Sequence, residues 1–148
     1  MSNAATEITN LLYRYAELMD AGDFHGVAGL FEHARVQQGQ GAGETFGSAP
    51  MLATWNKYVH VYEDGTPRTK HVITNPIVEI DEAAGTATCR SYYTVLQAAP
   101  GFALQIVCAG RYHDAFERVG GGWRFAYRDY SMMELVGDMS AHMLVAVG

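Results

Sequence analysis

Residues 68–75 carry the sequence RTKHVITN, which opens a run of apolar, β-branched residues that is typical of a buried β-strand. His71 lies among the first residues of this predicted strand. Because successive side chains of a strand point to opposite faces, we expect His71, Ile73 and Asn75 to share one face. A histidine at the start of a strand is commonly satisfied by a backbone carbonyl or by solvent, so its role has to be judged from the rest of the chain.

The first segment predicts an amphipathic helix, because apolar residues recur at helical spacing between Ile8 and Met19. Thr6 is the expected N-cap of this helix, and Gly22 is expected to end it. Asp20 falls in the last turn, where the negative end of the helix dipole disfavours a carboxylate unless a donor or a cation lies near. A simple surface position is the alternative for Asp20.

A contact between Asp20 and His71 would satisfy both residues. An imidazole donor would stabilise the carboxylate, and a buried imidazole N–H needs an acceptor. We therefore predict that these two side chains, 51 residues apart in the sequence, meet within hydrogen-bond distance.

The remaining pattern places helices before strands. Asp23 is the predicted N-cap of a short second helix, residues 34–38 are a short strand, and a third helix begins near Ser48. Four long strands follow, separated by short breaks that contain glycine, at residues 71–80, 86–98, 103–119 and 122–136. This order predicts an α+β cone, in which N-terminal helices pack on a curved antiparallel sheet and enclose a cavity. Gly110 and Gly122 are the positions where the sheet is expected to bend.

Length and composition bound the class of protein. The 148 residues are predicted to form one domain, residues 1–148, with residues 1–5 disordered or derived from a tag. An apolar fraction of 49% with 18% charged residues is globular, and no apolar run approaches the roughly 18 residues of a membrane-spanning helix. The net charge of −6, with two lysines, argues against a nucleic-acid partner. No secretion signal is recognised, so a cytoplasmic location is expected.

No cofactor and no metal are predicted. The histidines show no HxxxH spacing, and the sequence contains no GxSxG, P-loop or dinucleotide fingerprint. Cys89 and Cys108 lie in separate strand patterns and are expected to be reduced core residues. The late methionines favour a pliable apolar lining, and residues 138–143 predict a capped terminal turn over the mouth of the cavity.

Three segments of the chain resemble the SnoaL-like branch of the nuclear transport factor two-like superfamily. They are YAELMDAGDFHGVAGLF at residues 15–31, RTKHVITNPIVEI at residues 68–80 and GRYHDAFERVGGGWRFAYRD at residues 110–129. Their order and spacing are similar to those of the family over almost the whole chain. The resemblance implies a cone-shaped α+β barrel, whereas the chemistry of this superfamily ranges over dehydratases, isomerases, cyclases, dehalogenases and non-catalytic binding modules.

The resemblance also implies site residues. The stretch around His71 is similar to that of scytalone dehydratases, and Asp20, His71 and Arg128 match residues of hexachlorocyclohexane dehydrochlorinases, where the aspartate and histidine act as a dyad. Arg128 is then expected to face the cavity, uncovered by protein carboxylates, and to steady negative charge on a substrate. The chain departs from these relatives at Tyr15, where the dehydrochlorinase has a lysine, and at Met19, where the dehydratase has a tyrosine.

The remaining predicted substrate contacts are aromatic and apolar side chains with one amide, namely Tyr15, Met19, Trp55, Asn75, Tyr130 and Met132. The expected ligand is a small hydrophobic ring compound of an aromatic, steroid-like or polyketide-like kind. Neutral imidazole, with a reference pKa of about 6.5, is suited to proton abstraction near neutral pH. The expected activity is therefore that of a cofactor-independent lyase or isomerase, similar to a dehydratase, a dehydrohalogenase or a ketosteroid isomerase.

A non-catalytic module that binds a small molecule or an assembly partner is the alternative. Several substrate-orienting residues of the similar enzymes are absent, and an Asp–His pair can persist as a structural hydrogen bond. The identity of the substrate, and the choice between lyase, isomerase and binding, stay open at this point.

Two expectations concern the sheet. Its exposed face is predicted to carry Tyr92, Phe116, Phe125 and Tyr127, which favours a homodimer through that face, with a trimer as the alternative. Arg111 and Asp114 are expected to pair within the sheet, either across strands or with Arg124.

Overall fold

The computed structural model describes residues 3–39 and 41–144. Within these ranges the chain forms helices and strands in the order α1 (Ala4–Asp20), α2 (Phe24–Gly29), β1 (Arg35–Gln37), β2 (Glu44–Phe46), α3 (Ser48–Tyr58), β3 (Thr69–Asp81), β4 (Thr86–Ala99), β5 (Phe102–Val119), β6 (Gly122–Asp129) and β7 (Met133–Val136).

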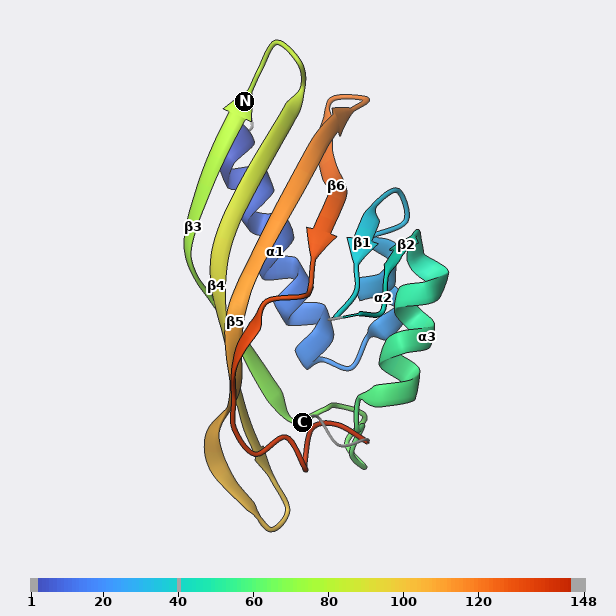
Figure 1. Cartoon of the computed structure of the whole chain (residues 1–148), viewed down its shortest axis with the longest axis vertical. Coiled ribbons are helices and arrows are strands. Elements are labelled where there is room, and N and C mark those ends of the chain that lie inside the picture. The colour runs from blue at the N-terminus through green and yellow to red at the C-terminus, as the bar shows by residue number, and fades with distance from the viewer. Residues whose placement is uncertain (1–2, 40, 145–148) are drawn as a thin grey trace.

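The strands form one curved sheet in the order β2-β1-β6-β5-β4-β3, and β7 pairs with β5 away from this path. Figure 1 shows α1 lying along the long strands, while α2 and α3 gather beside β1 and β2. The predicted α+β architecture is confirmed, with two differences. The sheet is open rather than closed, and β1 joins β6 in parallel. Parallel pairing is accessible here because the two strands are far apart in the sequence and no tight turn links them.

Helix α1 buries one apolar stripe against the sheet, and Ile8, Leu12 and Met19 are almost completely covered. Its N-cap is Asn3, whose side chain accepts hydrogen bonds from the backbone N–H groups of Ala5 and Thr6. The prediction that Thr6 caps this helix is therefore wrong. Residues 3–5 belong to the fold, contrary to the expected disorder of residues 1–5, and residues 1 and 2 lie outside the described residues.

The second helix begins as predicted, because the Asp23 side chain accepts a hydrogen bond from the Gly26 N–H. Gly22 precedes it with a φ of +77°. A β-carbon at Gly22 would lie 2.1 Å from the carbonyl oxygen of Gly65, so this close approach also requires glycine. The end of α1 is thereby held near the loop that leads to β3.

Strand β3 contains an irregularity that the alternation rule does not foresee. Its pairing with β4 shifts by one residue between Thr74 and Ile77. Pro76 has no N–H for the ladder, and Asn75 takes a φ of +42°, a conformation that asparagine tolerates better than most residues. His71 and Ile73 face inward as predicted, whereas Asn75 is exposed. The prediction that Asn75 shares the face of His71 is therefore wrong.

The predicted strand at residues 122–136 divides into β6 and β7, and residues 130–132 form the bend between them. The chain then turns back under the long strands, where residues 138–143 form the terminal turn. In this turn the Ser140 N–H donates to the Asp138 side chain, and the Gln97 side chain donates to the Ala141 carbonyl oxygen. The predicted capped turn at this end of the chain is present.

The outer face of the sheet is apolar at several positions, although two of the predicted residues do not contribute. Phe116 and Phe125 are buried in the core, on the side covered by the helices. Tyr92 is 55% exposed, and Tyr127 lies partly covered under the Arg35 guanidinium. The remaining exposed apolar side chains of the sheet include Val72, Ile77, Leu104, Ile106, Leu135 and Val136. Association through this face stays a prediction.

Across the described residues, no helix combines the length and the apolar character needed to span a bilayer.

Substitution of the two glycines at which bending was expected, Gly110 and Gly122, should affect stability to different extents. A β-carbon at Gly110 would lie 2.1 Å from the Met132 carbonyl oxygen and 2.8 Å from the Tyr93 hydroxyl, whereas at Gly122 it would meet nothing. We expect Gly110→Ala to lower the free energy of unfolding by about 1–3 kcal/mol through overpacking. Gly122→Ala is expected to change it by less than about 0.5 kcal/mol. Urea unfolding of both variants measures this, and equal effects would contradict the close packing at Gly110.

Candidate active site

Asp20 and His71 meet at one wall of the fold. His71 Nδ1 lies 2.6 Å from Asp20 Oδ1, and both side chains are at most 10% exposed. The His71 backbone N–H also donates to Asp20 Oδ2 at 2.8 Å, and the Thr69 hydroxyl donates to Oδ1 at 2.9 Å. Because a carboxylate can only accept, Nδ1 carries the proton, and Nε2 is left as the basic nitrogen of the neutral ring. The predicted contact between Asp20 and His71 is present, and a catalytic role for the pair stays a prediction.

The local sequence explains why this contact forms. Asp20 is the last residue of α1, and the last turn of that helix contains no basic side chain. Its carboxylate therefore faces the negative end of the helix dipole without a local cation. The three donors supplied by Thr69 and His71 at the start of β3 compensate this unfavourable position.

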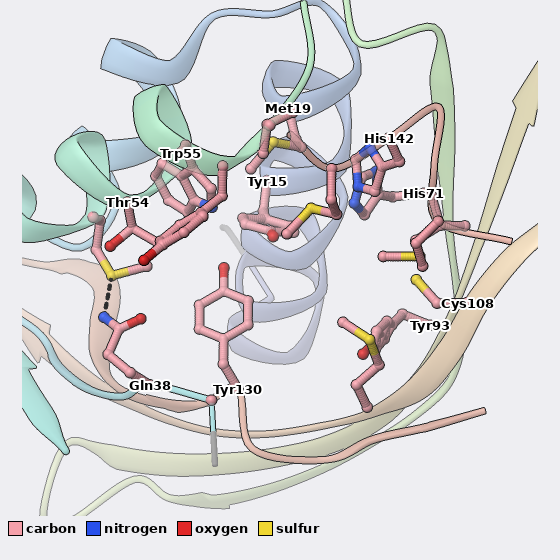
Figure 2. A pocket seen from close by; sticks show the side chains of 18 of the residues that line it. Tyr15, Met19, Gln38, Thr54, Trp55, His71, Tyr93, Cys108, Tyr130 and His142 are labelled. Atoms are coloured by element: carbon pink, nitrogen blue, oxygen red, sulfur yellow. Dashed lines mark hydrogen bonds between the residues drawn. The ribbon is translucent and has the colours of Figure 1, made fainter. Parts of the chain in front are cut away.

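A cavity of about 210 Å³ lies in front of His71, between α1, α3, the long strands and the terminal turn. Figure 2 shows His71 and His142 side by side at one end and Gln38 at the other, with aromatic and sulfur-containing side chains between them. The lining is mainly apolar and includes Met51, Val59, Val95, Cys108, Met133, Met139 and Met143. A cavity of this kind suits a ligand with an apolar body and few polar groups.

Four of the predicted substrate contacts line this cavity, namely Tyr15, Met19, Trp55 and Tyr130. Two predicted contacts do not. Asn75 lies exposed at the bulge of β3. Met132 is bound to β5 through its backbone, because its carbonyl oxygen accepts a hydrogen bond from the Arg111 N–H. The next residue, Met133, lines the cavity instead. Neither Asn75 nor Met132 therefore lines the cavity, because a bulge in β3 turns Asn75 outward and Met132 lies in the bend between β6 and β7.

Arg128 does not occupy the position that the resemblance implies. It is completely buried, and its guanidinium forms two hydrogen bonds with the Asp114 carboxylate, at 2.7 and 3.0 Å. The prediction that Arg128 is uncovered by protein carboxylates is wrong. Asp114 on β5 and Arg128 on β6 are direct cross-strand partners, so their side chains share one face and meet. Arg124, the alternative partner considered for Asp114, pairs instead with Glu117.

The buried arginine has a structural position beneath the cavity. Its guanidinium carbon lies 3.9 Å from the ring centre of Tyr112 and 4.5 Å from that of Tyr15, within the range of cation–π attraction. Burial by itself would lower the pKa of Arg128, but the Asp114 carboxylate raises it well above the ordinary value. Arg128 is thus a permanent positive charge that fixes the tyrosine rings from below.

The cavity is rich in tyrosine hydroxyls that stay protonated. Burial raises the pKa of Tyr15, Tyr112 and Tyr130 well above the usual value, although the charge of Arg128 acts in the opposite direction on each. The Tyr130 hydroxyl is buried and has no hydrogen-bond partner among the described residues. In Figure 2 it points into the cavity, where it is available as a donor to a ligand.

Sequence reasoning missed three residues of this site. Tyr93 and Tyr112 stack with ring centres 4.3 Å apart, and both line the cavity. Their inward positions follow from the β4–β5 register, which is not readable from the sequence. His142 also lines the cavity, although it was predicted only as part of the terminal turn. Burial, followed by the neighbouring His71, lowers the pKa of His142 to about 4.

No group of three or more His, Cys, Asp or Glu side chains that could hold a metal ion occurs among residues 3–39 and 41–144. Cys89 and Cys108 are buried free thiols, and burial raises the pKa of each to about 11, so neither is a reactive thiolate at neutral pH.

The helices, the curved mixed sheet and the apolar cavity define a small-molecule pocket of the nuclear transport factor two-like, cystatin-like fold. The chain matches the model of the SnoaL-like domain over residues 1–129. It therefore belongs to the SnoaL-like domain family. No match was found among curated proteins.

Solved structures support this assignment. A protein of unknown function from Mycobacterium tuberculosis is 28% identical in sequence, with a TM-score of 0.70, and the match covers 97% of this chain and 77% of that one. A provisionally assigned aromatic ring hydroxylase from Novosphingobium aromaticivorans is 23% identical, with a TM-score of 0.70 and coverage of 93% and 95%. A provisionally assigned scytalone dehydratase from the same organism is 20% identical, with a TM-score of 0.65 and coverage of 84% and 80%. The last two likenesses establish the fold alone.

The buried ion pair predicts a strong asymmetry between single and double variants. Arg128→Met leaves the Asp114 carboxylate buried without a partner, so we expect a loss of about 3–5 kcal/mol in the free energy of unfolding. Arg128→Met combined with Asp114→Leu should recover most of this loss. The control is Arg124→Met, which breaks the half-exposed pair with Glu117 and should cost less than about 1 kcal/mol. Equal losses for the two single variants in urea unfolding would contradict the structural role of Arg128.

The depressed pKa of His142 predicts a specific acid sensitivity. The folded state binds this proton only below about pH 4, whereas the unfolded chain binds it below the reference value of 6.5. The unfolded state therefore holds more protons between these values, and stability falls as the pH decreases from 6.5 to 4, by about 3 kcal/mol from this group. Phenylalanine at position 142 cannot take up a proton. The free energy of unfolding of His142→Phe should therefore fall by about 3 kcal/mol less than that of the wild type between pH 6.5 and pH 4. Urea unfolding at several pH values measures this, and an equal pH dependence of the free energy of unfolding in the two proteins would contradict the low pKa of His142.

Proposed function

We propose that the protein is a cofactor-independent lyase or isomerase, in which His71 takes a proton from a carbon atom beside a carbonyl group. The observation that carries this proposal is the geometry of the dyad. Asp20 holds Nδ1 and the backbone N–H of His71, which fixes the tautomer and leaves Nε2 for a ligand in the cavity. A base positioned in this way typically contributes 10²–10⁴-fold to a rate.

The role of each residue follows from what it touches. His71 accepts the proton, and Asp20 orients the ring and stabilises the imidazolium that forms. Tyr130 offers an unpartnered hydroxyl to a polar group of the ligand. Met19 and Trp55 supply apolar contacts to its ring. Arg128 supports the tyrosines from below and does not touch the substrate.

The cavity also limits the class of substrate. Within residues 3–39 and 41–144, no Lys, Arg, Asp or Glu side chain lines the cavity, and burial keeps the hydroxyls of Tyr15 and Tyr130 neutral. A neutral, largely apolar ring compound with a few oxygen atoms therefore fits better than an anion or a sugar. Family membership and a cavity of this character both support a small-molecule ligand.

A non-catalytic binding module is the second candidate, and one observation favours it. The expected electrophile, Arg128, is bound to Asp114 through Nε and Nη2 and does not line the cavity, so among the described residues no cation of the lining balances negative charge on a reacting oxygen. In that case the contact between Asp20 and His71 would serve only the packing of α1 on β3, for which three hydrogen bonds are sufficient reason.

Proton exchange separates the two candidates without knowledge of the natural substrate. 2-Tetralone, a neutral bicyclic ketone, exchanges its α-protons in D2O, and NMR follows the rate. We expect the wild-type protein to accelerate this exchange, and Asp20→Asn to lower the acceleration by about 10²–10⁴-fold, because the imidazole loses its orienting carboxylate. Asp23→Asn is the matched control, since asparagine also caps helices well and Asp23 lies outside the cavity.

Two results would count against catalysis. One is exchange in the presence of the wild-type protein at the rate of buffer alone. The other is an Asp20→Asn variant that is folded, less stable and unchanged in exchange. Either result would favour the binding module.

A further inference from the structure

The cavity contains a second imidazole besides that of His71, and it belongs to His142. His142 lies on the terminal turn after β7 and is 7% exposed. Its ring centre is 6.4 Å from that of His71, and the two ring planes are inclined by 67°. At this separation the rings cannot hydrogen-bond to each other directly. The space between them is suited to one intervening oxygen atom.

His142 lacks the hydrogen bonds that a buried histidine normally has. Its Nδ1 atom is fully buried and has no partner among residues 3–39 and 41–144. Buried polar atoms are paired in the great majority of cases, and an open one points to a water or a ligand that completes the bond. The ring lines the same cavity as His71, so a ligand there can supply the missing partner.

The backbone around His142 is firmly held, which makes its ring a fixed element of the wall. The His142 carbonyl oxygen accepts a hydrogen bond from the His60 N–H at 2.8 Å. The preceding carbonyl, of Ala141, accepts from the Gln97 side chain at 2.9 Å and from the Tyr62 hydroxyl. The turn is thus held from two segments, namely the stretch after α3 that contains His60 and Tyr62, and strand β4 with Gln97.

His142 stays uncharged beside His71. Burial is the largest cause of its low pKa, the neighbouring His71 adds to it, and Asp20 opposes it weakly. His142 is therefore neutral at pH 7, with one nitrogen as donor and the other as acceptor. When His71 takes up a proton, its new charge further disfavours a second proton on His142. His142 can therefore act as a neutral hydrogen-bond donor beside His71.

We propose that His142 contacts the substrate directly and donates a hydrogen bond to the oxygen atom beside the carbon from which His71 takes a proton. This inference rests on the proposed function. In the step, the C–H bond breaks, its proton forms a bond to His71 Nε2, and its electron pair moves into the carbon–carbon bond of an enolate. The enolate oxygen accepts the hydrogen bond from His142, so this neutral donor takes the place of the cation that Arg128 does not provide.

A stable enol tests the contact without turnover. 2-Naphthol has a hydroxyl on a fused ring system and resembles the enol of 2-tetralone, whereas naphthalene has the same rings without oxygen. We expect His142→Phe to weaken 2-naphthol binding about tenfold and to change naphthalene binding less than twofold, because one hydrogen bond is worth about that factor. Titration calorimetry measures both affinities. His113→Phe, a histidine on the exposed part of β5, is the matched control and should change neither.

The result can overturn the proposal in three ways. 2-Naphthol could fail to bind the wild-type protein, it could bind His142→Phe as tightly as the wild type, or both probes could lose affinity equally. If His142→Phe does not fold, His142→Leu takes its place, with the same selective loss expected. Selective loss of 2-naphthol binding in a protein that does not exchange the protons of 2-tetralone would support the contact and refute the proposed function.

Discussion

The Asp20 carboxylate is the constraint on which the rest of the site depends. It ends α1 at the unfavourable pole of the helix dipole and is stabilised by three donors from the first residues of β3. These bonds join the end of α1 to the start of β3, and they hold the His71 ring at the wall of the cavity. A change to this carboxylate therefore alters both the contact between helix and sheet and the orientation of the His71 ring.

A second buried charge supports the floor of the cavity. Arg128 Nε and Nη2 donate to the Asp114 carboxylate, and the guanidinium lies against the rings of Tyr15 and Tyr112. An unpaired charge at this depth would be very unfavourable, so the pair is a fixed unit and is not available to a ligand. Its effect on function is indirect. It holds the aromatic rings in place and gives the lower wall of the pocket a rigid surface.

The chemistry available inside the cavity is that of neutral groups. Burial raises the pKa of Tyr15 and Tyr130 and lowers the pKa of His142, so these groups are uncharged near pH 7. A pocket of this kind suits a neutral ring compound better than an ion, because no Lys, Arg, Asp or Glu side chain lines it among the described residues. The two imidazoles and the Tyr130 side chain are among the polar groups of the wall, and the methionines make its apolar part adaptable in shape.

The sequence by itself determined that helices precede the long strands, and hence the α+β architecture, because this order follows from local periodicity, but it did not show β2 or the division between β6 and β7. The partnership of Asp20 and His71 followed from two residues whose isolated positions are unfavourable, together with the family resemblance. The sequence could not determine where strand alternation is interrupted. Counted from the β5–β6 turn, regular pairing places Asp114 opposite Tyr127, and a one-residue bulge moves its partner to Arg128. A similar bulge turns Asn75 outward, and there the Asn–Pro pair was a readable warning. The return of the terminal turn toward β3 also brings His142 to His71. Strand register and this return are decided only when the strands pack, because a slip of one residue turns every side chain of a strand to the other face.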